Sequence, residues 1–194
     1  MNETLREELT AMAAEDRRVR QELLQAGKLG DGYAPQMEEV HRKNASRLKQ
    51  IILEHGWPDR DLVGEEGTLA AWLIAQHAIG DPEFQKSALT LIQQKVEHRR
   101  VPAAQEAYLS DRIAMYEGRP QKYGTQSVLC PDGQYKRWNT EDPEHLNERR
   151  VSMGMPPVED DPPEMQPTSQ SLVEYQHWLV GYEDWLRRTG WRRT

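Results

Sequence analysis

The sequence predicts an all-α protein, a bundle of about five main helices with a small β-hairpin and a tethered C-terminal helix. Two observations favour this fold class. Apolar residues recur at the helical spacing over most of the chain, and capping residues and prolines stand where the apolar stripes begin. Only residues 125–138 break this pattern, since two short runs there flank the turn from Pro131 to Gly133 and predict the hairpin.

The first two helices are predicted from their stripes and their end signals. Apolar residues along 5–23 form the first stripe, and Gly27 stands where a helix would end. Pro35 suits the first turn of a second helix, because its missing N–H is not needed there. Gly56, followed closely by Pro58, marks the end of that helix.

The middle helices follow after a loop expected at residues 63–67. Residues 69–79 are apolar almost all round, which is typical of a helix buried in the middle of a bundle. Residues 81–83 combine an N-cap, a proline and a first-turn acid, and therefore predict the start of the next helix. A further helix is expected from about residue 102 to residue 117.

The last third of the chain changes character. After a short helix to about residue 153, residues 156–168 are rich in proline and acids and predict an extended linker. We therefore divide the chain into a helical domain at 1–155, this linker, and a helix at 169–194 that is rich in Trp and Arg. That helix is expected to fold back over the bundle, because exposed tryptophans would form an unusually large apolar patch. A homodimer through the helix is the alternative.

Composition excludes several classes of protein. Of the 194 residues, 25 are Lys or Arg and 32 are Asp or Glu, and the net charge of −7 argues against a nucleic-acid partner. No apolar run approaches the length of a membrane span, so no membrane role is expected. The N-terminus does not resemble a signal peptide, and Cys130 is the only cysteine. Both features favour a cytoplasmic address.

Polar residues interrupt the apolar stripes of three predicted helices. In the second predicted helix His41 and Asn44 point toward the core of the bundle. Gln76 and His77 end the most buried helix, and Asp111 in the last bundle helix shares a face with apolar residues. Burying such groups costs about 1–3 kcal/mol each unless they find partners. Helices that point His41, His77 and Asp111 inward would form a polar pocket.

A loop after the last bundle helix could form the rim of this pocket. Arg119, Tyr123 and Gln126 give the loop more side-chain donors than a plain connector needs, and Gly124 would let the backbone approach a ligand. A loop held by its own side chains explains the same residues equally well.

A series of short motifs runs along residues 5–158. They are Ala14-Glu15-Asp16 with Arg20, His41-x-x-Asn44-x-x-Arg47-Leu48, His55-Gly56-Trp57-Pro58, Leu62-Val63-Gly64, Ala70 to Ala78, Asp81 to Gln85, Tyr108-Leu109-x-Asp111-Arg112, Gly118 to Gln121, Tyr123 to Gln126 and Glu148-Arg149-Arg150. Together they resemble a bacterial family known only as a domain of unknown function. The chain departs from the family pattern from about residue 160.

The resemblance supplies no activity. It implies that several polar residues belong to motifs rather than to variable surface, namely Gln76, His77, Asp111, Arg112, Tyr123 and Gln126.

We expect an enzyme that acts on a small polar molecule by acid–base chemistry, without an organic cofactor. His77 would be the general acid or base, Asp111 would orient it, and His41 would be a second proton carrier. Hydrolysis, elimination, isomerisation and cyclisation all fit, as would a biosynthetic role. The substrate would be bound by Asn44, Gln76, Arg112, Arg119, Tyr123 and Gln126.

Two alternatives stay open. The first is a binding or interaction protein without chemistry, in which the polar pocket is a satisfied core. The second is a metal enzyme, since His41, His77 and Asp111 would be a set of two histidines and one carboxylate. No pair of histidines stands at the i,i+4 spacing that would make a metal site the leading interpretation.

Overall fold

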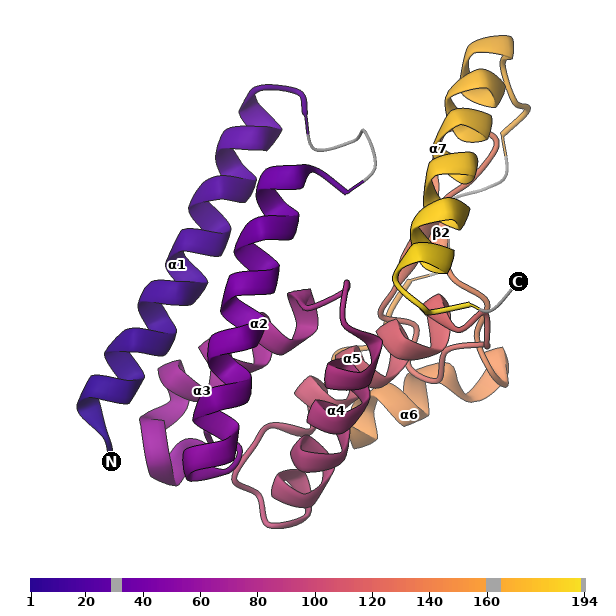
Figure 1. The fold of residues 1–194 in the computed structure, drawn as a ribbon. Coiled ribbons are helices and arrows are strands. Elements are labelled where there is room, and N and C mark those ends of the chain that lie inside the picture. The colour runs from indigo at the N-terminus through magenta and orange to yellow at the C-terminus, as the bar shows by residue number, and fades with distance from the viewer. Residues whose placement is uncertain (29–32, 160–164, 193–194) are drawn as a thin grey trace. The chain divides into compact units, whose positions relative to one another are not determined.

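Helices make up most of the chain, as its apolar periodicity predicts. The computed structural model describes residues 1–28, 33–159 and 165–192 (Figure 1). Its elements fall into two units, Met1–Glu106 and Ala107–Thr194, and each unit is described by itself. The predicted all-α fold class with one small hairpin is confirmed.

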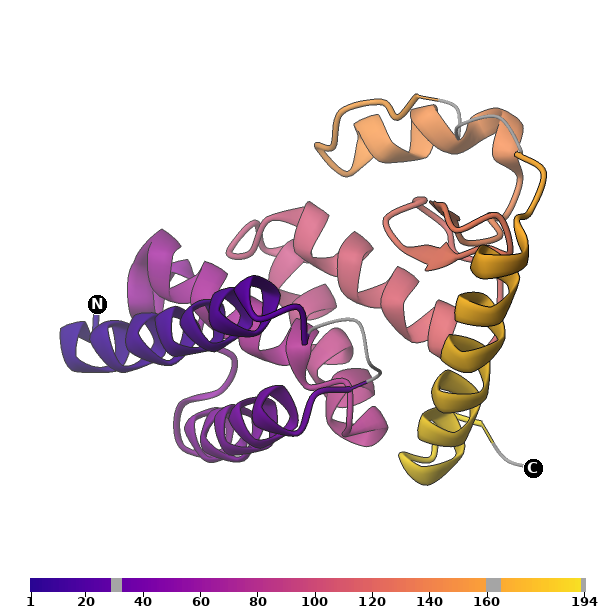
Figure 2. The same cartoon turned by 90° about the horizontal axis from the view of Figure 1, so that it is seen from above.

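Two long helices, α1 (Glu3–Gln25) and α2 (Pro35–His55), lie side by side in the first unit (Figures 1 and 2). Asn2 caps α1, because its side chain accepts a hydrogen bond of 3.1 Å from the backbone N–H of Leu5. The buried stripe of α1 consists of four apolar residues and Asp16.

Helix α3 (Arg60–His77) begins earlier than expected. Asp59 caps it by accepting the backbone N–H groups of Asp61 and Leu62. The loop expected at residues 63–67 is instead a kink, at which Gly64 has a φ of 71° that other residues rarely adopt. The prediction of a loop was wrong because glycines in this stretch were interpreted as the end of regular structure, whereas the helix continues beyond the kink.

Helix α4 (Pro82–Glu97) starts at the predicted signal, with Asp81 accepting the backbone N–H of Phe84. Helix α5 (Ala103–Tyr116) follows. In the first unit α3 packs mainly on α1 and also contacts α2 and α4. Within the described residues no helix is long and apolar enough to cross a membrane.

The core of the first unit is formed where the apolar faces of α1, α2 and α3 meet. Leu9, Leu48, Ile51 and Ile74 are at most 1 % exposed there. Burial of such a side chain contributes roughly 1.5–3 kcal/mol to folding. This apolar contact holds the three helices together around the polar residues that follow.

The second unit contains the hairpin. Strands β1 (Ser127–Leu129) and β2 (Tyr135–Arg137) pair antiparallel, with Val128 opposite Lys136. A 3-10 turn, η1 (Pro143–His145), leads into the short helix α6 (Leu146–Ser152). The predicted hairpin and short helix are therefore both confirmed.

The C-terminal helix α7 (Ser169–Arg188) packs within the second unit (Figure 2). Trp185 and Trp191 are buried, and the centroid of each indole lies 5.1 Å from the ring of Tyr116. Arg192 donates to the backbone carbonyl of Tyr116, at 3.0 Å. The helix therefore packs on Tyr116, the last residue of α5, within its own unit. Residues 160–164 of the predicted linker lie outside the described residues.

Candidate functional site

In the first unit the carboxylate of Asp16 lies between two buried or half-buried histidines. One carboxylate oxygen lies 3.1 Å from Nε2 of His41, and both oxygens lie 3.0 Å from Nδ1 of His77. The imidazole centroids of the two histidines are 5.2 Å apart. The three residues, which we call the Asp16 cluster, come from α1, α2 and α3, so the cluster exists only when the bundle is assembled.

Asp16 is kept charged by its neighbours. The residue is 1 % exposed, and burial alone would raise the pKa of the carboxyl. The close contacts and the charges of His41 and His77 outweigh burial and hold this pKa well below its ordinary value. Asp16 therefore serves as a fixed negative charge beside two groups that can carry a proton.

His41 is held from its other side by Tyr33. The tyrosine oxygen lies 2.6 Å from Nδ1 of His41, and the two rings are tilted at a centroid distance of 5.6 Å. Nε2 of His41 lies 3.1 Å from Asp16 but makes no hydrogen bond among the described residues. Tyr33 thus sets the orientation of the ring, and Asp16 supplies the charge that it faces.

Two buried amides position the helices that carry the cluster. Asn44 donates to the backbone carbonyl of Met12, one turn before Asp16, at 3.2 Å. Gln85 is fully buried on α4 and donates to the carbonyls of Ala75 and Gln76, at 2.8 and 3.0 Å. These carbonyls belong to the last turn of α3, and that of Ala75 also accepts the backbone N–H of the C-cap residue Ala78. Gln85 therefore fixes the turn from which His77 projects.

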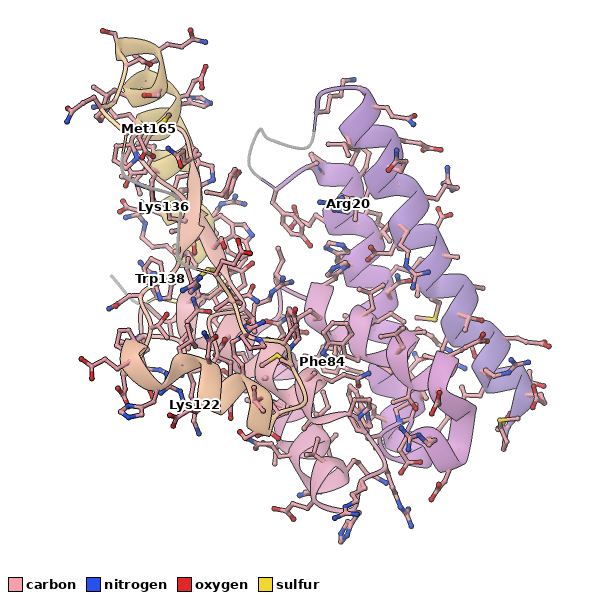
Figure 3. The ribbon with its side chains drawn as sticks, turned by 180° about the vertical axis from the view of Figure 1, so that it is seen from behind. Arg20, Phe84, Lys122, Lys136, Trp138 and Met165 are labelled. Carbon is pink, nitrogen blue, oxygen red and sulfur yellow. The ribbon has the colours of Figure 1, made fainter. Side chains whose placement is uncertain are left out.

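A cavity of about 220 Å³ opens beside the cluster. Its lining consists of Arg20, Tyr33, Ala34, Met37, His41, His77 and Ile79. Arg20 lies on α1, one turn after Asp16, and is labelled in Figure 3. A second cavity, of about 310 Å³, shares Tyr33 and His41 with the first and is also lined by Lys49 and Asp81.

The structure brings two of the predicted site residues together. His41 and His77 line the same cavity, as expected from their places in the apolar stripes. Asn44 and Gln76 are buried as predicted, at 6 % and 3 % exposure. Asn44 bonds the backbone of α1, so the structure gives it a structural partner where a substrate contact was expected.

Asp111 has a different environment from the one predicted. Its carboxylate accepts the backbone N–H groups of Lys122, Tyr123 and Thr125, as well as the hydroxyl of Thr125, at 2.8–3.1 Å. Burial raises the pKa of the Asp111 carboxyl, and this effect outweighs that of the hydrogen-bond donors, which favour the charged form. The carboxylate on Nδ1 of His77 is Asp16 and not Asp111, because the 122–125 loop occupies both oxygens of Asp111.

The other predicted binding residues belong to the same loop network of the second unit. Arg112 donates to the side-chain oxygen of Gln126 at 3.1 Å, and the backbone carbonyl of Tyr123 accepts from Arg150 at 2.7 Å. Arg119 pairs with Glu117 at the surface. These contacts correspond to a loop held by its own side chains, the alternative that the sequence left open.

Sequence reasoning missed Asp16, Arg20 and Tyr33 as site residues. Asp16 and Arg20 stand in the first of the motifs quoted above, and Asp16 interrupts the stripe of its helix just as His41 does. The signal was therefore present for Asp16. Tyr33 follows a glycine-rich connection, and no spacing rule connects such a residue to a histidine eight positions later.

Comparison with known proteins identifies the family. A family of unknown function, DUF6624, matches residues 3–163. The chain belongs to this family. No curated protein and no solved structure matches the chain. The DUF6624 match includes all three residues of the Asp16 cluster and ends before α7 begins.

Proposed function

We propose that this DUF6624 protein is an enzyme that acts on a small polar molecule by proton transfer at the Asp16 cluster. The observation that supports it is the contact of Asp16 with Nδ1 of His77 beside a cavity. A carboxylate on one imidazole nitrogen fixes the tautomer and leaves the other nitrogen to exchange a proton with a ligand. Asp16 takes the orienting role that the sequence suggested for Asp111.

His77 and His41 have different roles in this proposal. The side chain of His77 is 24 % exposed and that of His41 is 10 % exposed, so His77 is the more accessible member of the cluster. It would be the general acid or base. His41, connected to Tyr33, would be the second proton carrier, and no organic cofactor is needed for such a step.

Arg20 suggests that the substrate carries an anionic group. Among the described residues Arg20 makes no ion pair or hydrogen bond, and it lines the cavity with His41 and His77. A guanidinium in this place suits a carboxylate or a phosphate, which it can bind through two hydrogen bonds. The single cysteine fits a cytoplasmic substrate pool.

The test is turnover of a panel of small carboxylates, amides and phosphate esters, followed by mass spectrometry. The His77→Gln and Asp16→Asn variants should lose at least about 10²-fold in rate, which is the usual contribution of a general acid or base. His98→Gln is the matched control, since His98 is an exposed histidine of the same unit. Equal rates in His77→Gln and the wild type would contradict the proposal.

A binding protein without chemistry is the second candidate. The observation that favours it is that two buried amides near the cluster bond the protein itself, since Asn44 donates to Met12 and Gln85 donates to the end of α3. In that case a carboxylate would bind in the cavity, but it would be recovered unchanged. Binding seen by NMR at the His77 imidazole without turnover of any panel member would support this candidate.

A further inference from the structure

We infer that the Asp16 cluster binds one divalent transition-metal ion of the zinc type. The three residues offer one oxygen and two nitrogens as ligand atoms, all within 4.8 Å of one another. Zinc bonds to these atoms are about 2.0–2.2 Å long, which places neighbouring ligands of a tetrahedral site ~3.3 Å apart. The two separations around Asp16, 3.0 and 3.1 Å, are within a few tenths of an ångström of that value.

The orientation of His41 favours an ion over a proton. Its side chain is 10 % exposed, and Nε2 lies 3.1 Å from Asp16 without making a hydrogen bond among the described residues. A buried nitrogen without a hydrogen bond is costly unless something else fills the position. A nitrogen that lies 3.1 Å from a carboxylate oxygen without a hydrogen bond to it is at the separation expected of two ligands of one shared ion.

Tyr33 supplies the support that metal-bound histidines need. A histidine that binds a metal through Nε2 carries its proton on Nδ1 and donates it to an outer partner. The oxygen of Tyr33 lies 2.6 Å from Nδ1 of His41 and can accept that proton. Gln85 holds the backbone turn of α3 before His77, so two of the three ligands are oriented from behind.

The ligand set indicates the class of metal. Two imidazoles and one carboxylate suit Zn²⁺ and similar ions better than Mg²⁺ or Ca²⁺, which prefer oxygen ligands. The cavity of about 220 Å³ beside His41 and His77 leaves room for a water or substrate ligand. An open position of this kind is the mark of a catalytic site rather than a structural one.

This inference rests on the site of the proposed function, but not on proton transfer by His77. A bound ion would lower the pKa of a water ligand and would take over the role of His77 as the group that releases a proton. Cavity, anionic ligand and Arg20 would keep their roles. The two ideas can therefore fail independently.

The experiment uses the full chain, freed of metal with a chelator and then exchanged into chelator-free buffer. Zn²⁺ binding is measured by calorimetry and by metal analysis after gel filtration, and Co²⁺ binding by its visible absorption. We expect one ion per chain. We also expect at least tenfold weaker binding in each of Asp16→Asn, His41→Gln and His77→Gln. His98→Gln controls for binding to exposed histidines and should retain the ion.

Circular dichroism on each variant separates loss of a ligand from loss of the fold. Should Asp16→Asn fail to fold, the two histidine variants carry the test. Failure of the wild type to retain Zn²⁺ would overturn the inference, as would unchanged affinity in the histidine variants. Turnover that persists in excess chelator would overturn a catalytic metal and leave proton transfer by His77 standing. A chain that binds the ion but turns over no substrate would support the metal site and contradict the proposal that the protein is an enzyme.

Discussion

Nδ1 of His77 lies 3.0 Å from both carboxylate oxygens of Asp16, although the two residues are 61 positions apart in the sequence. The contact joins the third turn from the end of α1 to the last residue of α3. Each helix contributes a residue that is costly to bury alone, and the pair removes much of that cost. Stability and chemistry are therefore coupled at this position.

The first prediction concerns the pH dependence that Asp16 gives to stability. Its pKa is lowered in the folded chain, because His41 and His77 favour the charged form against the effect of burial. A carboxyl with a lowered pKa stabilises the fold at any pH above its pKa in the unfolded chain, which is about 3.9. This stabilisation is lost as the pH falls from there toward the pKa of the folded chain. At pH 5 Asp16→Asn should lower the free energy of unfolding by about 1–3 kcal/mol.

The difference between the wild type and Asp16→Asn should shrink below about pH 4. Urea unfolding at pH 5 and at pH 3 measures it. Asp61→Asn is the control, since the Asp61 side chain is 64 % exposed and pairs with Arg100 at the surface. Its effect should stay within about 0.5 kcal/mol. A difference for Asp16→Asn that grows in acid would show that the sign is wrong.

The second prediction concerns Gln85 as a positioning residue for His77. Gln85→Met keeps the volume but leaves the carbonyls of Ala75 and Gln76 without their buried donor, which should cost about 1–3 kcal/mol. The end of α3 should shift as well, and with it the imidazole ¹⁵N signals of His77. Gln94→Met on the exposed face of the same helix should change neither. If Gln85→Met loses stability while the imidazole ¹⁵N chemical shifts of His77 stay unchanged, Gln85 has a structural role and does not position His77.

Much of the fold was predictable because helix periodicity and capping are local. The starts at Asn2 and Asp81 follow from side chains that accept the N–H group three residues later. The kink at Gly64 was not predictable in the same way. A glycine ends one helix and only bends another, and the difference depends on tertiary packing.

The site was predictable in part for the same reason. His41 and His77 interrupt apolar stripes, so burial toward one core could be inferred from spacing alone. The residue that pairs with His77 could not be inferred from the sequence. Asp16 and Asp111 both stand on apolar faces of helices, and only the assembled chain shows that Asp111 bonds to the 122–125 loop. Spacing shows which residues point inward, but not which of them meet.

The third prediction treats Asp111 as the anchor of that loop. Asp111→Asn replaces one acceptor oxygen by an NH₂ group that faces backbone donors, which should cost about 1–3 kcal/mol. Thr125→Val removes the hydroxyl that donates to Asp111 and accepts from the Gln126 amide, and should cost about 1 kcal/mol. Neither change should alter ligand or metal binding at the Asp16 cluster. Calorimetric melting gives the first result, and loss of cluster binding in a folded Asp111→Asn chain would restore the predicted role in the site.

The fourth prediction separates two costs at Gly124. Its φ is +66°, and a methyl group there would lie 2.9 Å from a side-chain carbon of Arg137 and 3.2 Å from Leu146. Gly154 has a similar φ of +71° but nothing within 4 Å. Gly154→Ala should cost about 1–2 kcal/mol for the left-handed backbone alone. Gly124→Ala should cost more in urea unfolding, and equal costs would show that Arg137 and Leu146 move aside freely.

The last prediction concerns α7, which lies outside the DUF6624 match. Trp185 is 6 % exposed and packs on Tyr116, so Trp185→Ala should cost about 3–5 kcal/mol. Val180→Ala is the control on the same helix, because Val180 is 69 % exposed.

A chain that ends at residue 160 should melt at a lower temperature than the full chain, since Tyr116 would lose both Trp185 and Trp191. Its solution mass distinguishes the two roles considered for α7. If both chains run as monomers and the truncated chain melts at the lower temperature, α7 packs on its own unit. A full chain that runs as a dimer and becomes a monomer on truncation would instead show that the exposed face of α7, with Val173 and Val180, pairs with a second copy.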